Sequence, residues 1–414
     1  MARVAVIGGG IVGVCCAVYA RRAGHEVTLY ERGDIGGEAS YGNAGIMSSG
    51  GCVPMALPGV LKTVPKMLLA ADGPLSIRWS YIPRLVAWMT RFVRSGKPAR
   101  VEEISCALHR LLSEAQAAYD EIMDKARFDD HLVSKGLLFP FSSQAAFAGS
   151  ARARAIRAAR GVTFEVVDAD RLRALEPALH VDFHNGILFE DARHTLDPGG
   201  LAKALARDFV AAGGHIENLA VQAVTERHQG VEVQGSDGHN DYDFAVIAAG
   251  VWSRRLLANG LRHIPLESER GYHAMLPTPA VAVSRPMIFS ELGFAVTPMR
   301  DGLRVSGLVE FAGLRAPPDF RKAERMLRRA KDVLPAINTA GAKFWMGHRP
   351  SMPDSMPVLG PSRPRSRLLL AVGHGHQGMG FAAITGKIIA ALISGTPVPV
   401  DIDAFSPMRF TRGM

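Results

Sequence analysis

Short apolar runs and glycine-rich turns alternate at the start of the chain. Residues 3–7 (RVAVI) are rich in β-branched side chains, and residues 11–24 have helical character that ends at Gly24. Residues 26–30 form a second apolar run, which finishes at Glu31. β-Branched runs favour strands, and a glycine after a helical pattern favours the C-terminal cap of a helix. The pattern predicts a strand, a glycine-rich turn, a helix and a second strand that ends in an acid.

The same reading predicts further elements along the chain. Residues 197–214 form a helical pattern, while residues 215–226 and 230–238 alternate like strands. Residues 294–311 predict a hairpin that turns at the sequence RDG. Residues 320–334 predict a strongly basic amphipathic helix whose arginines face solvent.

The composition is that of a folded chain. Its 414 residues suffice for two domains and a large core, and 48% hydrophobic against 21% charged residues is typical of a globular protein. The cysteines stand at positions 15, 16, 52 and 106, without a C-x-x-C pair or metal-ligand spacing. We therefore expect reduced thiols in a cytoplasmic protein, and no metal site.

Basic residues outnumber acidic ones, and the net charge is +9. They are scattered, and no nucleic-acid-binding motif is present, so nucleic acid is not expected as a partner. Residues 59–97 differ, because they mix large apolar side chains with seven Lys or Arg residues and a single Asp. This stretch is too interrupted to span a bilayer but suits peripheral contact with a membrane. A pair of ordinary core helices is the alternative.

The turn after the first strand carries the fingerprint G-x-G-x-x-G at residues 8–13. Gly8 permits the tight turn, Gly10 lets backbone N–H groups approach a pyrophosphate, and Gly13 lets the helix lie close to the strand. The helix N-terminus favours phosphate charge, and Glu31 can accept hydrogen bonds from ribose hydroxyls. With its strand, helix and acid in place, the fingerprint predicts a dinucleotide site.

The loop after Glu31 distinguishes the cofactor. Residues 33–50 (GDIGGEASYGNAGIMSSG) are rich in glycine and serine, where a simple NAD domain would soon begin another helix. Such a loop offers additional backbone donors for a longer cofactor with a flat ring. It favours FAD over NAD.

A second fingerprint lies in residues 373–380 (GHGHQGMG). A separate dinucleotide unit would need a further parallel strand, but Pro397 and Pro399 are unsuited to one, and few residues follow Asp401. These glycines are therefore expected to close on the first cofactor. The helix that begins near Met379 would then direct its positive end at the flavin.

Three linked stretches carry a resemblance to a known family. They are GGGIVG with the following ER and EASYGNAG, then DFAVIAAGVWS at residues 243–253, and GHGHQGMGFAAITGKIIAALISG near the C-terminus. In this order they resemble the FAD-dependent D-amino acid oxidase superfamily. The continuation SYGNAGIMSSG…PMALPG is most similar to bacterial D-amino acid dehydrogenases, including their D-hydroxyproline-oxidising relatives.

The resemblance implies an α/β fold with two interleaved domains. A Rossmann-type FAD-binding domain would alternate along the chain with an α+β substrate domain that contains a mostly antiparallel sheet. The expected FAD-binding domain comprises residues 1–50, 190–262 and 350–414, and the expected substrate domain comprises residues 51–189 and 263–349.

The resemblance and the fingerprints together imply a set of contacts to FAD. Val221 falls where the family reads adenine with backbone groups. No cysteine stands in a familiar flavin-linking motif, so non-covalent FAD is expected. The expected FAD-binding residues are Gly8, Gly10, Ile11, Val12, Gly13, Glu31, Arg32, Ser40, Asn43, Ala44, Gly45, Ile46, Val221, Ala249, Gly250, Trp252, Gly375, His376, Gly378, Met379 and Gly380.

Arg349, in the sequence GHRP, is the expected substrate clamp. A planar guanidinium fork suits a carboxylate, and the family uses an arginine in a similar context for the substrate carboxylate. An arginine held in a structural ion pair is the alternative. Residues 267–276 predict a strand with Tyr272 and His273 on opposite faces, so both cannot point at one site. We expect Tyr272 to donate to the carboxylate beside Arg349.

Histidines complete the expected substrate site. His348 and His376 are expected to contact substrate, and His376 joins Arg349 and Tyr272 as an expected catalytic residue. A histidine in the flavin loop could touch the ring, accept the amine proton or attach the flavin, or it could serve as a structural donor.

Three functions fit these residues. The first is oxidation of D-amino acids to 2-oxo acids, with hydride transfer from Cα to flavin N5 and electrons passed to quinone or another non-oxygen acceptor. The second is oxidation of D-proline, cis-4-hydroxy-D-proline, sarcosine or glycine. The third is an FAD-bearing electron-relay subunit without its own substrate site, against which the intact clamp at Arg349 argues. A cytoplasmic location, with peripheral contact to the inner membrane through residues 59–97, is expected for the first.

Overall fold

The structure is a computed structural model, and it describes the chain apart from residues 60–72, 124–127, 129, 258–260 and 412–414. The helices that the argument uses are α1 (Ile11–Arg22), α3 (Ile82–Ser95), α4 (Pro98–Ile122), α6 (Gln144–Gly149), α7 (Ala151–Ala159), α8 (Ala169–Leu175), α9 (Pro198–Ala211), α10 (Ser253–Leu256), α11 (Arg321–Val333) and α12 (Gly378–Ser394). Short 3₁₀ turns include η1 (Ser49–Cys52), η3 (Gly250–Trp252) and η4 (Gly375–Gln377).

The strands form two large sheets and two small ones within the described residues. They are β1 (Arg3–Ile7), β2 (Glu26–Glu31), β3 (Ile46–Met47), β4 (Leu75–Ile77), β5 (Leu132–Val133), β6 (Leu137–Phe141), β7 (Glu165–Asp168), β8 (Asn185–Phe189), β9 (Arg193–Thr195), β10 (His215–Asn218), β11 (Ala223–Glu226), β12 (Val231–Gly235), β13 (Gly238–Tyr242), β14 (Phe244–Ile247), β15 (Glu267–Leu276), β16 (Met287–Phe289), β17 (Phe294–Met299), β18 (Gly302–Phe311), β19 (Lys343–Ser351), β20 (Val358–Pro361) and β21 (Leu368–Val372).

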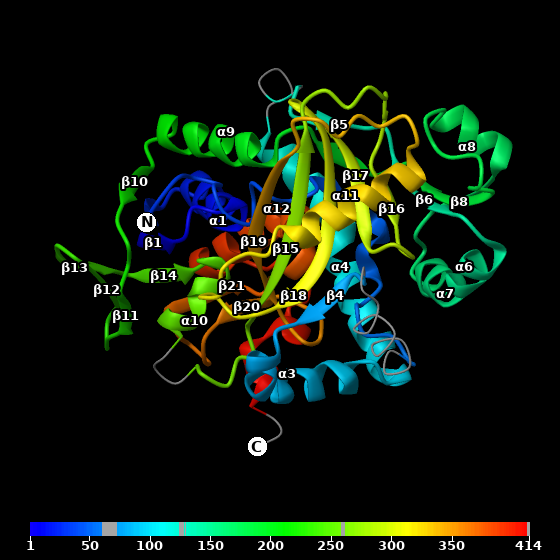
Figure 1. The fold of residues 1–414 in the computed structure, drawn as a ribbon. Helices are drawn as coiled ribbons and strands as arrows, with labels where there is room; N and C mark the ends of the chain where they lie inside the picture. The colour runs from blue at the N-terminus through cyan, green and yellow to red at the C-terminus, as the bar shows by residue number, and fades with distance from the viewer. Residues whose placement is uncertain (60–72, 124–127, 129, 258–260, 412–414) are drawn as a thin grey trace.

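The first large sheet has the strand order β10-β2-β1-β14-β21-β20 and is parallel except for the antiparallel edge pair β20–β21. Its central strands are apolar runs because both faces are covered. Helix α1 packs against α12, and α12 packs against α4, so the beginning and end of the chain share one core (Figure 1). The predicted strand, turn, helix and strand of residues 3–31 are all present.

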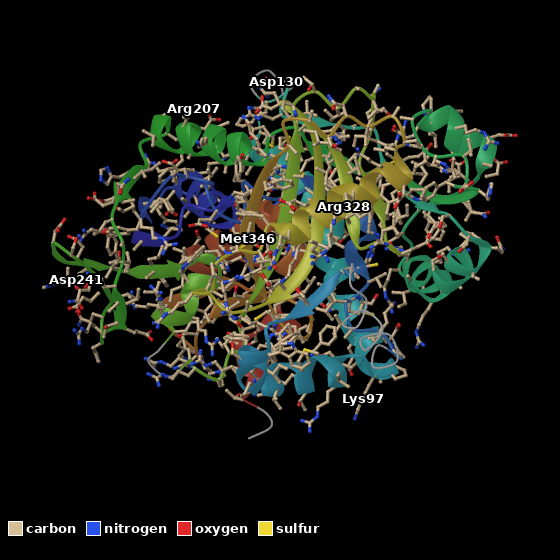
Figure 2. All side chains as sticks on the ribbon, in the orientation of Figure 1. Lys97, Asp130, Arg207, Asp241, Arg328 and Met346 are labelled. Atoms are coloured by element: carbon tan, nitrogen blue, oxygen red, sulfur yellow. The ribbon has the colours of Figure 1, made fainter. Side chains whose placement is uncertain are left out.

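The second large sheet has the order β19-β15-β18-β17-β16-β6-β8-β7 and is mostly antiparallel. The hairpin predicted for residues 294–311 is β17–β18. Helix α11 covers the outer face of this sheet, and Arg321 and Arg328 on it are exposed, as its basic pattern predicts (Figure 2). In Figure 1 the β11–β13 sheet and the α6–α8 group lie at opposite ends of the molecule. The two large sheets together make the predicted α/β fold.

Helix α12 is largely apolar and mostly buried, with Lys387 as its one charged residue. By length and composition the segment Gly375–Ser394 could cross a membrane, but 67% of its apolar window is buried inside the protein. It ends at Gly395, whose φ of +67° gives the left-handed cap that favours glycine. Helix α12, which begins in the C-terminal glycine loop, is thus held in place by the core.

The basic apolar stretch 59–97 is only partly visible, because residues 60–72 lie outside the described part of the chain. Within the remainder, α3 buries Leu85 and Trp88 against Phe311. Its outer side carries Val86, which is 56% exposed, and Trp79 just before it is 84% exposed. Helix α3 is therefore amphipathic, with one face packed in a small core cluster and the other exposed.

Candidate active site

The glycines of residues 8–13 have the geometry that a phosphate-binding turn needs. Gly8 has a φ of +116°, which a residue with a side chain rarely adopts. A Cβ on Gly13 would lie 1.8 Å from the carbonyl oxygen of Gly8, so only glycine lets α1 approach the strand this closely. Gly10 is different, because among the described residues a Cβ there would meet only the Ser40 hydroxyl, at 3.5 Å. The space beside Gly10 is thus left open at the N-terminus of α1.

Glu31 ends β2 beside this turn. Its carboxylate accepts hydrogen bonds from the backbone N–H of Gly9 at 2.6 Å and of Gly33 at 3.0 Å. The neighbouring Arg32 places its guanidinium over the ring of Trp252, 4.3 Å from the centroid. Glu31 and Trp252 thus border one space, with the carboxylate fixed by backbone donors.

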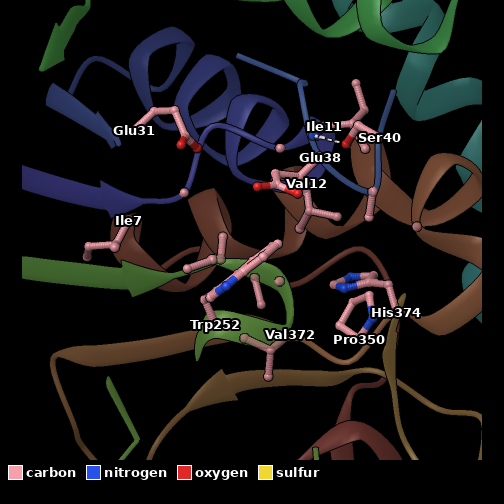
Figure 3. A pocket seen from close by; sticks show the side chains of 18 of the residues that line it. Ile7, Ile11, Val12, Glu31, Glu38, Ser40, Trp252, Pro350, Val372 and His374 are labelled. Carbon is pink, nitrogen blue, oxygen red and sulfur yellow. Dashed lines mark hydrogen bonds between the residues drawn. The ribbon is translucent and has the colours of Figure 1, made fainter. Parts of the chain in front are cut away.

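A cavity of about 450 Å³ runs from Glu31 to the C-terminal glycine loop. Figure 3 shows Glu31 and Ile7 on one side of it, Trp252 in the middle, and Pro350 and His374 on the other side. The expected cofactor residues that line it are Gly8, Gly10, Ile11, Val12, Glu31, Arg32, Ser40, Asn43, Val221, Ala249, Gly250, Trp252, Gly375, Gly378 and Met379. Its volume lies in the usual range for small-molecule and cofactor sites.

Several expected cofactor residues do not line this cavity. Gly13 acts through helix packing, and Gly45 makes a left-handed turn (φ +73°) supported by the Asn43 side chain, which accepts a bond from the Gly45 N–H at 2.7 Å. Ala44, Ile46, His376 and Gly380 are likewise absent from its lining. Sequence reasoning missed other lining residues, among them Ile7, Tyr30, Leu219, Gln222, Pro350 and His374.

These residues fit FAD. Helix α1 begins at one end of the cavity and α12 at the other, so two positive helix ends face the space. The loop of residues 38–43 crosses it, and its Ser40 hydroxyl accepts a hydrogen bond from the N–H of Ile11 at 2.9 Å. The N-terminal and C-terminal glycine loops meet across one cavity, as the second fingerprint predicted.

Buried Arg304, on β18 of the second large sheet, holds the loop of residues 38–43, which is called the cofactor loop below. Its Nη1 donates to the carbonyl oxygens of Tyr41 at 2.8 Å and Asn43 at 2.6 Å. Burial lowers the pKa of Arg304 to about 10, and its Nε has no hydrogen-bond partner among the described residues. Sequence reasoning missed this contact, because no local pattern links a hairpin residue to loop residues 261 and 263 positions earlier.

Arg349 lies on β19 opposite Glu269 of β15. Its Nη1 is 3.1 Å from Glu269 Oε1 and donates to the carbonyl oxygen of Leu308 at 2.9 Å. Its Nη2 makes one long bond, 3.4 Å, to the Gly307 carbonyl. The ion pair that was the alternative for Arg349 is therefore present. Within the described residues, the Nε–H and one Nη2–H stay without a partner, so one side of the fork is open.

Glu269 was not predicted from the sequence, yet it joins three groups. Its Oε1 lies 2.5 Å from His376 Nε2 as well as against Arg349, and its Oε2 accepts a bond from the Ser351 hydroxyl at 2.9 Å. Burial alone would raise the pKa of this carboxyl group. The nearby His376, Arg349 and Ser351 outweigh burial and lower the pKa to about 2. Glu269 is thus an anion that ties β19 to the flavin loop.

Tyr272 lies on the face of β15 that is turned away from Arg349. Its hydroxyl donates to Glu310 at 2.6 Å and accepts from the N–H of Asp319 at 3.2 Å, on the α11 side of the sheet. The placement of Tyr272 beside Arg349 as a carboxylate donor was wrong. The alternation of the strand was read correctly, but the residue on the inner face is His273.

His273 belongs to an aromatic cluster on the inner face. It stacks on Trp345, with centroids 5.0 Å apart, and both rings contact Tyr41 of the cofactor loop. Burial, together with the nearby Arg304 cation, lowers the pKa of His273 to about 3. Trp345 and Arg349 lie on the same face of β19, because they are four residues apart. This neutral aromatic cluster and the arginine therefore share one face of the sheet.

His348 and His374 have structural partners. The ring of His348 lines the cavity, its Nδ1 is 2.8 Å from the Ser268 hydroxyl, and burial beside Arg270 lowers its pKa to about 4. His374 bonds to the Thr385 hydroxyl at 3.1 Å, and complete burial lowers its pKa to about 3. Both rings are neutral at physiological pH, so neither supplies a cation to the site.

Comparison with known proteins identifies the class. Residues 3–392 match the DAO family, described as FAD dependent oxidoreductase, and the chain belongs to that family. It is 37% identical to a D-amino-acid oxidase of Bradyrhizobium diazoefficiens over 98% of both chains. It is 32% identical to a D-amino acid dehydrogenase of Paramagnetospirillum magneticum over 99% of both chains.

Solved structures share the fold at lower identity. A glycine oxidase from Geobacillus kaustophilus superposes with a TM-score of 0.72 at 20% identity, and each chain is covered completely. An L-proline dehydrogenase from P. horikoshii superposes with a TM-score of 0.74 at 18% identity, covering 100% of this chain and 98% of the other. FAD as the cofactor and an oxidoreductase acting on amino acids are thus confirmed for this chain by its family and its relatives.

Proposed function

We propose that the protein oxidises D-amino acids to 2-oxo acids and ammonia through an imino acid. Relatives over the full chain are named D-amino-acid oxidase or D-amino acid dehydrogenase. The observation that carries the proposal is the Arg349 guanidinium, whose Nε–H and one Nη2–H have no partner among the described residues. An anion with two parallel oxygens, such as the carboxylate of an amino acid, fits these two N–H groups.

Each residue has a defined task in this reaction. Bound FAD supplies an acceptor for the hydride that leaves Cα. Arg349 holds the substrate carboxylate, and because Glu269 fixes its Nη1, the clamp is oriented before substrate arrives. Trp345, His273 and Tyr41 exclude water beside the clamp and give the substrate side chain an apolar surface.

The test is product formation across a substrate panel with a dye as electron acceptor. D-Alanine, D-methionine and D-phenylalanine are expected to yield their 2-oxo acids, while the L-enantiomers yield none. Glycine, sarcosine, D-proline and cis-4-hydroxy-D-proline belong to the same panel. Turnover of these alone, without any primary D-amino acid, would replace the proposal with the cyclic or secondary amine reading.

The electron acceptor is proposed from the surface around α3. Arg84, Arg94 and Lys97 are exposed there with Trp79 and Val86, and such a basic apolar face suits an anionic membrane that contains quinone. The relative at 37% identity is named an oxidase, whereas those at 27–32% are named dehydrogenases. We propose the dehydrogenase behaviour for this chain.

A quinone analogue or dye is accordingly expected to reoxidise the reduced protein much faster than air does. The protein is also expected to float with anionic vesicles at low salt and to be released at high salt. Peroxide formation in air that matches substrate consumption mole for mole would contradict the proposed acceptor. If the protein does not float with the vesicles, only the proposed membrane contact would be contradicted.

A further inference from the structure

Glu269 connects the substrate clamp to the flavin loop through a single oxygen atom. Its Oε1 is 3.1 Å from Arg349 Nη1 and 2.5 Å from His376 Nε2. The guanidinium and the imidazole are therefore neighbours, although they come from β19 and η4. An α-amino acid carries its carboxylate and its ammonium on the same carbon. A substrate whose carboxylate binds Arg349 consequently has its nitrogen close to this pair of side chains.

The carboxylate fixes the tautomer of His376. Glu269 is fully ionised at neutral pH, since its pKa is held near 2, and an ionised carboxylate only accepts hydrogen bonds. Nε2 of His376 must therefore carry the hydrogen. When the ring is neutral, Nδ1 is left as an acceptor, and no hydrogen bond occupies it within the described residues. A carboxylate that orients a histidine in this way is the arrangement found in general-base dyads.

The other titratable groups around the dyad do not compete for this role. His348 on β19 and His374, directly before η4, are neutral and bonded to hydroxyl groups. Glu267 on β15 is engaged with Arg254, at 3.4 Å. Leu308 and Gly307 of β18 contribute only backbone carbonyl oxygens. His376 is also 36% exposed, so a proton that it receives can pass on to water.

We propose that His376, oriented by Glu269, accepts a proton from the ammonium group of the substrate at Nδ1. The proposal rests on the proposed function. An N–H bond of the ammonium group breaks, a new N–H bond forms on the imidazole, and the electron pair stays on the amine nitrogen. The neutral amine can then donate that pair as hydride leaves Cα. His376 is the catalytic residue in this step, and Glu269 is a positioning residue.

The experiment measures anaerobic reduction of the flavin of the holoenzyme by a D-amino acid as a function of pH. His376→Gln is expected to lower the rate about 100-fold at pH 7. The loss is expected to shrink as pH rises, because the free amino acid then loses its own ammonium proton. Added imidazole should restore part of the rate at pH 7. An unchanged pH profile in His376→Gln would overturn the proposal.

Glu269→Gln tests whether Glu269 orients His376 or only stabilises the fold. The amide keeps the size of the side chain but can either donate or accept, so it no longer fixes the tautomer of His376. The limiting rate of flavin reduction is expected to fall about 10-fold at unchanged FAD content, without a rise in KM. An unchanged limiting rate, with only a lower melting temperature, would show a structural counter-ion and contradict the dyad.

His215→Gln provides the matched control. His215 on β10 also has Nε2 near a carboxylate, 2.9 Å from Glu217, but this pair is exposed at the edge of the parallel sheet. Its removal is expected to leave the pH profile unchanged. Wild-type protein that no D-amino acid reduces would refute the proposed function itself. If a D-amino acid reduces the flavin of the wild type and His376→Gln keeps the same pH profile, the dyad alone would be refuted.

Discussion

Arg349→Lys raises KM for a D-amino acid about 10- to 100-fold in this account, while melting temperature and FAD content stay near wild type. Lysine can keep the ion pair with Glu269, because a point charge suffices for that contact. It cannot offer the two parallel N–H groups of the open edge of the fork. Amines that lack a carboxylate should be affected little, since they never use the clamp. KM, FAD occupancy and melting temperature are measured on the same sample.

Two further variants sharpen this result. Arg349→Ala removes both the fork and the partner of buried Glu269, so about 3–5 kcal/mol of transition-state binding and some stability should be lost together. Gly271→Ala acts on the clamp from the opposite strand, because its Cβ would lie 2.1 Å from Arg349 Nη2. The end of a flexible side chain can move aside, so KM should rise while the fold is kept.

The control is Arg409→Lys. Arg409 forms a buried ion pair with Asp354, at 2.9 Å, and has no place in the proposed substrate site. This variant should lose stability with KM unchanged, which is what a purely structural arginine predicts. If Arg349→Lys behaves like Arg409→Lys, the carboxylate clamp is refuted.

Gly10→Leu should abolish FAD retention without unfolding the protein. Gly10 has a φ of −68°, so a side chain adds no backbone strain, and among the described residues its Cβ would meet only the Ser40 hydroxyl. A leucine side chain would instead extend into the cavity at the N-terminus of α1, where the pyrophosphate is expected. The purified variant should be colourless, with a far-ultraviolet circular dichroism spectrum like that of the apoprotein.

Graded substitution tests the reason for the loss. Gly10→Ala adds a single methyl group at an ordinary contact distance and should retain most of the FAD. Gly149→Leu, at an exposed position with open space around it, should remain fully yellow. Full flavin occupancy in Gly10→Leu would mean that the phosphates do not pass this residue.

The N-terminal half of the cofactor site could be read from the sequence because its determinants are local. Gly8, Gly13 and Glu31 all belong to one unit of strand, turn, helix and strand at the start of the chain. The spacing of the three residues can therefore be recognised without knowing the rest of the fold. The C-terminal loop could be joined to that unit only by elimination, since two prolines ruled out a second dinucleotide domain. The shared cavity confirms that step.

The substrate side depends on strand register, which the sequence does not carry. The alternation of β15 separates Tyr272 from His273, but only the pairing with β18 and the cover of α11 decide which residue faces inward. The choice of Tyr272 failed for that reason. A hydrophobic pattern could not have settled it, because the strand is buried on both faces.

Glu269 was missed for the same reason. It reaches Arg349 through a strand pairing between residues 80 positions apart, and it reaches His376 through a loop from the other sheet. The one local signal was an acid within a strand that is buried along almost its whole length. A buried acid needs a cationic partner, so Glu269 could have been sought as a companion of Arg349.

Anaerobic bleaching of the flavin by one enantiomeric pair tests directly whether the protein oxidises D-amino acids. The purified yellow protein is mixed with D-methionine or L-methionine without oxygen, and the flavin absorbance is followed while the 2-oxo acid is assayed. We expect complete bleaching by the D-enantiomer, with one 2-oxo acid released per FAD, and an oxidised spectrum that persists with the L-enantiomer. Persistence of the oxidised spectrum with D-methionine and every other D-amino acid tried, or equal bleaching by both enantiomers, would contradict the proposed function.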